Sequence, residues 1–153
     1  MKITTLAAAL AAVGLAGCSM MGEHEHGGGM HGGMGGGMAG EHVTLSGSNE
    51  VPPVTTSATG SGNVTVGADC TVHARITVSG MQATAAHIHA GAAGMNGKVI
   101  VPFTKEGNDT FVAPPNAKLD SEGCAAYKSG QTYVNVHSDA HKGGEIRAQL
   151  KGS

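Results

Sequence analysis

The chain has few aromatic residues: Phe and Tyr together make up 3% of its 153 residues, and tryptophan is absent. A hydrophobic core must therefore be built from Val, Ile, Leu and Ala, which bury less area per residue than aromatic side chains do. Such a core leaves a small domain marginally stable, so a covalent cross-link would strengthen it.

Charged residues are also scarce, at 13% of the chain, and the formal net charge is −2. Lys and Arg form no cluster along the sequence, so we expect no nucleic-acid partner. The length fits a single domain. The one long apolar run is N-terminal and has about 12 to 15 residues, whereas a helix needs about 20 to span a bilayer.

The N-terminus has the order of an export signal. Lys2 precedes the apolar residues 3–14, and Leu15-Ala16-Gly17-Cys18 follows. This order predicts a signal peptide over residues 1–17, and the last four residues resemble the bacterial lipobox, whose cysteine is diacylated. A plain signal peptide with a chance cysteine is the alternative. Because Ser19 resembles an outer-membrane sorting signal, we predict a lipoprotein anchored to that membrane by an acyl chain such as palmitate at Cys18, facing the periplasm or the cell surface.

Two further cysteines, Cys70 and Cys124, form an even pair. An oxidising compartment favours a disulfide between them, and closing a loop of about 55 residues would add roughly 4 kcal/mol of stability on the chain-entropy model. A two-thiolate metal site is the alternative, although neither cysteine has a close neighbour of the C-x-x-C kind.

Composition divides the exported chain into two parts. Residues 18–41 are Gly-rich without a periodic apolar pattern, which predicts a disordered, flexible tether. In residues 42–153, Val, Thr and Ile alternate with small or polar residues, which predicts a folded domain of strands. The expected strands are 42–47, 62–66, 71–78, 85–90, 98–103, 109–112, 132–137 and 145–150. With one short helix over 120–128, the pattern predicts an all-β antiparallel sandwich or barrel.

Imidazoles and thioethers gather in the tether. They belong to His24, His26, Met30, His31, Met34 and Met38. The surrounding glycines disfavour a helix that would explain the four-residue Met spacing by packing. Thioether sulfur suits Cu(I), and imidazole suits Cu(II), Zn and Ni. We therefore predict auxiliary metal capture, above all of copper, with a solvated linker of no specific function as the alternative.

A second group of histidines lies in the predicted domain. His87 and His89 are two residues apart on one strand, so their side chains share a face and their Cα atoms lie about 6.6 Å apart. His137 ends another strand, and His141 follows in the next loop. If these strands are neighbours, three or four imidazoles converge on one metal ion. Solvated or mutually hydrogen-bonded histidines are the alternative. Ligation by neutral imidazoles would weaken as the pH falls through about 6.5.

Other polar residues have supporting roles in this interpretation. His42 and His73 are isolated and are expected at the surface. Glu50 is expected at the surface or in a turn that orients a loop, with a ligating role near the site as the alternative. Asp139 and Glu145 are placed to accept a ring N–H from a ligating histidine.

Three motifs resemble those of the CHRD domain, the module first described in chordin. They are LSGSNEVPPV at residues 45–54, AHIHAGAAGMNG at 86–97, and YVNVHS at 133–138 followed by GGEIRAQL at 143–150. The resemblance covers residues 42–151 in the family's order. It implies an immunoglobulin-like or superoxide-dismutase-like Greek-key β-sandwich, usually extracellular, with no established general activity.

The segment His87-Ile88-His89 also resembles, more weakly, the copper-binding strand of Cu/Zn superoxide dismutases. That resemblance implies copper at these two histidines and at His137. The chain departs from that family because no histidine lies between His89 and His137, so the bridging and zinc ligands have no counterparts. Arg147 also lies in a different motif from the arginine that guides superoxide.

These features favour a lipid-anchored protein of the bacterial cell envelope that binds a transition metal, copper above all, and a binding protein more than an enzyme. Two alternatives stay open. One is a metal-free structural or interaction module of the envelope. The other is a copper-dependent enzyme of the superoxide dismutase type.

Overall fold

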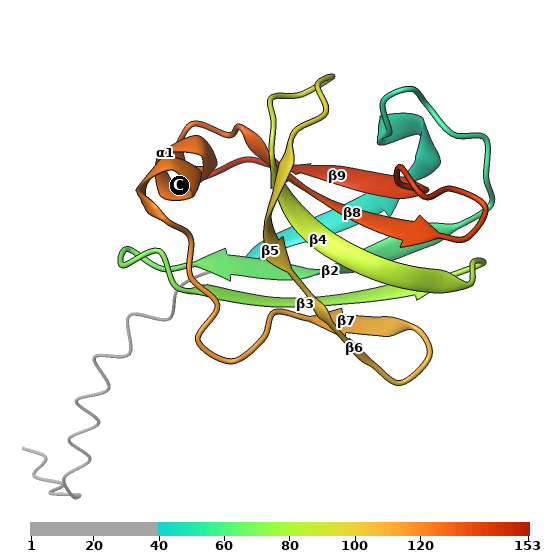
Figure 1. The fold of residues 1–153 in the computed structure, drawn as a ribbon, viewed down its shortest axis with the longest axis horizontal. Coiled ribbons are helices and arrows are strands. Elements are labelled where there is room, and N and C mark those ends of the chain that lie inside the picture. Colours follow the sequence, from blue (N-terminus) through green and yellow to red (C-terminus); the bar gives the residue numbers. More distant parts are fainter. Residues whose placement is uncertain (1–39) are drawn as a thin grey trace, which may run out of the picture. The chain divides into compact units, whose positions relative to one another are not determined.

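The computed structural model describes residues 40–153. The signal peptide, Cys18 and the metal-ligand candidates of the tether lie outside the described residues. Within residues 40–153 the chain forms nine strands, a short 3-10 helix η1 (Gly47–Asn49) and an α-helix α1 (Ser121–Lys128) (Figure 1). The strands are β1 (Glu41–Ser46), β2 (Thr59–Val66), β3 (Val72–Ser79), β4 (Ala83–Ala90), β5 (Lys98–Pro102), β6 (Thr104–Glu106), β7 (Thr110–Val112), β8 (Thr132–Ser138) and β9 (Ile146–Leu150). No helix of this part is long and apolar enough to cross a membrane.

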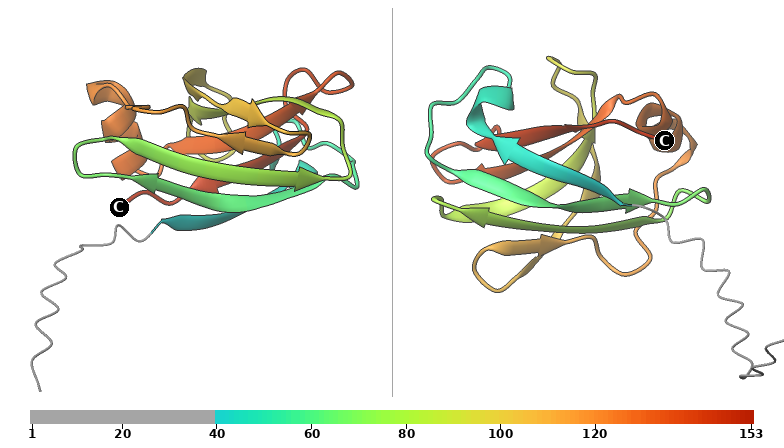
Figure 2. Two further views of the ribbon diagram at one scale, coloured as in Figure 1. Left: turned by 90° about the horizontal axis from the view of Figure 1, so that it is seen from below. Right: turned by 180° about the vertical axis from the view of Figure 1, so that it is seen from behind.

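The strands form one antiparallel sheet in the order β5-β4-β8-β9-β1-β2-β3-β7-β6. The sheet curls into two layers, with β4, β8 and β9 in one and β2, β3 and β7 in the other (Figures 1 and 2). Only Phe103 separates β5 from β6, yet β5 pairs with β4 and β6 pairs with β7 at the opposite end of the sheet. This segment nearly closes the sheet into a flattened barrel, and the predicted all-β architecture with one short helix is confirmed.

The core between the layers is aliphatic, as the composition requires. In β3, Val72, Ile76 and Val78 are buried while alternate residues such as His73 and Arg75 are exposed. The period of two follows from the pleat, which sends successive side chains to opposite faces. The other fully buried apolar side chains of the core include Leu45, Val64, Ile88, Phe111, Val134, Val136, Ile146 and Leu150.

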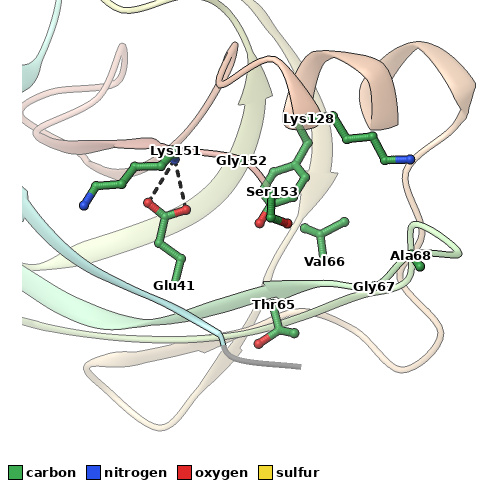
Figure 3. Close-up of a pocket in the computed structure, with 10 residues that line it drawn as sticks. Glu41, Thr65, Val66, Gly67, Ala68, Lys128, Lys151, Gly152 and Ser153 are labelled. Atoms are coloured by element: carbon green, nitrogen blue, oxygen red, sulfur yellow. Dashed lines mark hydrogen bonds between the residues drawn. The ribbon is translucent and has the colours of Figure 1, made fainter. Parts of the chain in front are cut away.

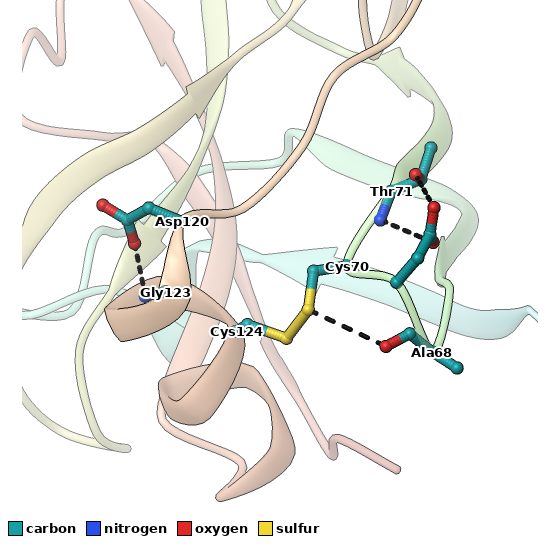
Figure 4. The surroundings of a disulfide bond; sticks show 7 residues. Ala68, Cys70, Thr71, Asp120, Gly123 and Cys124 are labelled. Atoms are coloured by element: carbon teal, nitrogen blue, oxygen red, sulfur yellow. Dashed lines mark hydrogen bonds between the residues drawn. A yellow bond between two sulfur atoms is a disulfide. The ribbon is translucent and has the colours of Figure 1, made fainter.

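The disulfide and α1 reinforce this light core at one end of the barrel. Asp120 caps α1 by accepting a hydrogen bond from the Gly123 N–H at 2.7 Å, and Gly130 with φ of +67° leaves the helix. The predicted disulfide is confirmed: Cys70, in the turn between β2 and β3, bonds to Cys124 of α1 with Cα atoms 5.8 Å apart (Figure 4).

The sequence pattern missed β6 and placed the start of β2 too late, at residue 62 instead of Thr59. All three residues of β6 are exposed, so no apolar alternation marks the strand. The start of β2 holds Gly60 and Gly62, and glycine usually weakens a strand. Here a Cβ at Gly62 would lie only 2.0 Å from the Arg75 carbonyl oxygen, so glycine permits the close approach of β3.

Candidate metal centre

The layer formed by β4, β8 and β9 has two chemically different faces. Directly paired residues of antiparallel strands share a face, and His87 pairs with Asn135, which pairs in turn with Arg147. The face toward the core is apolar, with Ile88 and Val134 buried in it. The pairing places polar side chains on the opposite, outer face: His87, His89, Tyr133, Asn135, His137, Arg147 and Gln149.

Two segments cover part of this outer face, so several of its polar side chains are buried. The Arg147 guanidinium donates a hydrogen bond to the Met95 carbonyl oxygen in the β4–β5 loop at 2.8 Å. From the end of η1, the Asn49 side chain donates to the Arg147 backbone oxygen at 3.1 Å. Asn96 links the two segments by donating to the Val51 oxygen at 2.7 Å. Figure 1 shows both segments rising on the same side of β8 and β9.

Three of the four predicted domain ligands meet on this face. The ligand nitrogens of His87, His89 and His137 all lie within 4.8 Å of one another. His87 Nδ1 and His137 Nε2 are 2.9 Å apart. The centroids of the His87 and His89 rings are 5.5 Å apart. The structure thus brings together the H-x-H pair of β4 and the last histidine of β8.

Backbone carbonyls fix the tautomers of two of these histidines. His89 Nδ1 donates to the Gly97 oxygen and His137 Nδ1 donates to the Lys142 oxygen, each at 2.9 Å. A carbonyl oxygen only accepts, so both rings carry their proton on Nδ1 when neutral, and both Nε2 atoms keep a lone pair. Within residues 40–153, His89 Nε2 is free, whereas His137 Nε2 accepts a hydrogen bond from His87 Nδ1. An outer partner that holds one ring nitrogen and directs the other into a site is typical of metal-binding histidines.

Burial keeps His87 neutral well into the acid range. Burial lowers the pKa of His87 to about 4, and the positive charges that His137 and His89 acquire on protonation act in the same direction. Burial also lowers the pKa of His89. Protons compete less with a metal ion for an imidazole that stays neutral below pH 6.5. Any ion held by His87 would therefore stay bound at lower pH than an ordinary histidine allows.

A stack of three side chains supports the buried side of the cluster. The His89 and Tyr133 rings are nearly parallel, with centroids 4.8 Å apart, and the Arg147 guanidinium carbon lies 3.3 Å from the Tyr133 centroid. The Tyr133 hydroxyl accepts a hydrogen bond from the Gly97 N–H at 3.1 Å. The stack therefore holds both the His89 ring and the peptide that orients it.

Glu50 is buried beside the cluster, so its expected place at the surface is wrong. It is 4% exposed, because the segment that carries it folds back over the outer face. Burial raises its pKa, while the charge of Arg147 and the Asn135 side chain act in the opposite direction. A Cβ at Gly144 would lie 2.5 Å from Glu50 Oε1 and 2.6 Å from Asn135 Nδ2, so this glycine makes room for both.

The prediction that Asp139 and Glu145 accept a ring N–H from the clustered histidines is also wrong. Backbone carbonyl oxygens accept these N–H groups instead. Asp139 is exposed, and the Glu145 carboxylate accepts hydrogen bonds from the Thr56 and Ser138 hydroxyls. Burial opposes the ionisation of Glu145, but these hydrogen bonds and the charge of His141 prevail and lower its pKa.

His141 lies outside the group of three that could share an ion. Its N–H bonds back to the Ser138 oxygen at 3.2 Å, so the chain turns and carries this histidine toward Glu145. His42 and His73 are exposed on other strands, as expected. Strand alternation places Tyr133, Asn135 and Arg147 on this outer face but does not predict their burial around the cluster.

A hollow of about 640 Å³ lies elsewhere, at the junction of β1, β2, the end of α1 and the C-terminal residues (Figure 3). Its wall includes Val66, Tyr127 and Lys128. The Lys151 N–H donates to both carboxylate oxygens of Glu41 at 2.9 and 3.0 Å. No lining residue belongs to the histidine cluster, so the two features are separate.

Residues 42–150 match the family model of the CHRD domain. The chain belongs to the CHRD domain family. No curated protein and no solved structure matches it. The segments of this CHRD domain that resemble the family motifs, 45–54, 86–97, 133–138 and 143–150, all contribute to the outer face. The first segment contains η1 and Glu50, and the second contains the two histidines of β4 and the loop that follows them. The last two contain the polar residues of β8 and β9.

Proposed function

We propose that this CHRD-domain protein binds a transition metal ion, with copper favoured, through His87, His89 and His137. The observation that carries the proposal is the pair of Nε2 lone pairs on His89 and His137, both fixed by backbone carbonyls and both directed into one cluster. Neutral imidazole is a good ligand for Cu(II), Zn and Ni.

The geometry needs little change to hold an ion. Two nitrogens that each lie about 2.0–2.1 Å from one ion are at most about 4.2 Å apart. No two ligand nitrogens of the cluster are more than 4.8 Å apart, so small rotations of the rings suffice. His87 and His137 share a proton at 2.9 Å, and the ion would take the place of that proton.

We further propose that the protein is held at the bacterial outer membrane by a lipid on Cys18 and that the tether residues load or scavenge metal. The lipobox-like order of residues 15–18 supports the anchor, and the soft thioethers of Met30, Met34 and Met38 suit Cu(I). Incorporation of labelled palmitate into the wild-type chain, and its loss in Cys18→Ser, tests the anchor.

The competing function is a metal-free module, and the hydrogen bond between His87 and His137 favours it because the two rings satisfy each other without a metal. Cu(II) titration separates the two. It uses a full chain in which the six tether candidates are replaced by Ser, called here the tether-silenced chain. We expect submicromolar binding that is lost in His87→Ala/His89→Ala and kept in the matched control His42→Ala/His73→Ala. Equal binding by both double variants would remove the proposed site.

A further inference from the structure

Three buried side chains around the histidine cluster each have a polar atom without a hydrogen-bond partner among residues 40–153. The atoms are His89 Nε2, Asn135 Oδ1 and Glu50 Oε1. The residues are 7%, 1% and 4% exposed. Leaving a buried polar atom unpaired is destabilising, so three such atoms together indicate a site that a ligand completes.

Asn135 occupies the middle of the cluster. It pairs directly with His87 across the β4–β8 ladder and lies two residues before His137 on the same face of β8. Its side chain also lies against His89, where it opposes the lowering of the pKa of that histidine by burial. Asn135 therefore neighbours all three imidazoles.

The unpaired atoms are all acceptors. His89 carries its proton on Nδ1, which donates to Gly97, so its Nε2 presents a lone pair. Asn135 Oδ1 presents another beside it. Two neighbouring lone pairs in a buried place repel each other, whereas a cation bound to both satisfies them.

We propose that Asn135 Oδ1 is a fourth ligand of the metal centre, so that the domain takes a divalent ion, Cu(II) or Zn(II), in preference to Cu(I). This inference rests on the proposed function, because it assigns an oxygen ligand and a charge preference to the same site. Three imidazoles and one amide oxygen make a donor set without sulfur, which suits divalent borderline ions better than soft Cu(I).

Glu50 positions the amide. The Asn135 side chain lies between His89 and Glu50, so in the ion-bound site an Nδ2–H donated to the carboxylate would turn Oδ1 toward the ion. Glu50 Oε1 and Asn135 Nδ2 both border the space that Gly144 leaves open. The buried carboxylate also attracts a doubly charged ion more strongly than a singly charged one.

The test compares Cu(II) and Cu(I) affinities of Asn135 variants in the tether-silenced chain. Asn135→Leu removes the oxygen, and we expect Cu(II) affinity to fall by about 10- to 100-fold while Cu(I) affinity stays within about threefold. Asn135→Asp keeps an oxygen at the same place and should restore Cu(II) binding. The visible absorption of bound Co(II), a reporter of the ligand set, should change in Asn135→Leu.

Glu50→Gln guards against a folding defect in Asn135→Leu, because it keeps the volume of the side chain. We expect it to weaken Cu(II) binding severalfold and to leave Cu(I) binding unchanged. An Asn135→Leu chain with wild-type Cu(II) affinity and an unchanged Co(II) spectrum overturns the inference alone. Weak Cu(II) binding by Asn135→Asp also overturns it. A parent chain that binds none of these ions overturns the proposed function as well.

Discussion

Replacing Arg147 by Met tests whether one buried cation holds the outer face together. Arg147 is 2% exposed, and its guanidinium donates to the carbonyl oxygens of Ala92 and Met95 and to the Asn96 side chain. Its charge also opposes the rise in the pKa of Glu50. Methionine fills a similar volume but removes every donor.

The magnitude follows from these contacts. A buried hydrogen bond from a charged donor is worth about 1.5–3 kcal/mol, and its loss leaves the acceptor unpaired. Arg147 makes several such bonds to the loop, so we expect Arg147→Met to lower the free energy of unfolding by about 4 kcal/mol. Adding Glu50→Gln removes the stranded carboxylate, so the double variant should show a coupling energy of about 1–3 kcal/mol. The loosened loop carries Gly97, so Cu(II) affinity should fall as well.

Urea unfolding followed by far-UV circular dichroism measures these values. Arg75→Met is the matched control: Arg75 pairs with Glu106 at 2.9 Å, but its side chain is 63% exposed. An exposed pair contributes about 0–1 kcal/mol. If Arg147→Met costs no more than Arg75→Met, or if the Arg147 and Glu50 substitutions are simply additive, the role assigned to Arg147 is refuted.

Two further predictions concern the whole domain. Replacing Cys70 and Cys124 by Ala removes a cross-link over a sequence separation of 54 residues. We expect the free energy of unfolding to fall by about 4 kcal/mol, and the reduced wild-type chain should lose the same amount. A variant as stable as the oxidised wild type would contradict this. Burial lowers the pKa of His87 from 6.5 to about 4 in the folded state. Between these values the unfolded chain binds a proton that the folded chain does not, so the stability of the metal-free protein should fall as the pH drops from 6.5 toward 4. His87→Gln should flatten that dependence in urea unfolding, and an unchanged slope would speak against the lowered pKa.

The sequence predicted the elements that local patterns control. The period of two in β3 and β4 placed apolar residues inside and put His87 and His89 on one face. His137 could join this pair only if its strand lay beside that of His87 and His89, a condition that strand alternation does not decide and that the β4–β8 ladder fulfils. The prediction that His141 joins the cluster was wrong, because a turn of four residues carries it away. The direction of that turn cannot be read from the sequence.

The buried polar residues could not be predicted for a different reason. Alternation marks Tyr133, Asn135 and Arg147 as facing outward, and outward residues are normally solvated. They are buried because the η1 segment and the β4–β5 loop lie over them, and that cover depends on contacts such as Asn96 to Val51 between segments far apart in the chain. Glu50 was misplaced for the same reason.

Arg147 has a second structural role, in the pairing of β1 with β9. The ladder that joins these strands consists of one residue pair, Ser46 with Arg147. The two halves of the barrel therefore join at the same residue that stacks on Tyr133 beneath His89. The junction of the sheet and the support of the His89 ring therefore depend on the same strand, so a substitution that loosens β9 should disturb both.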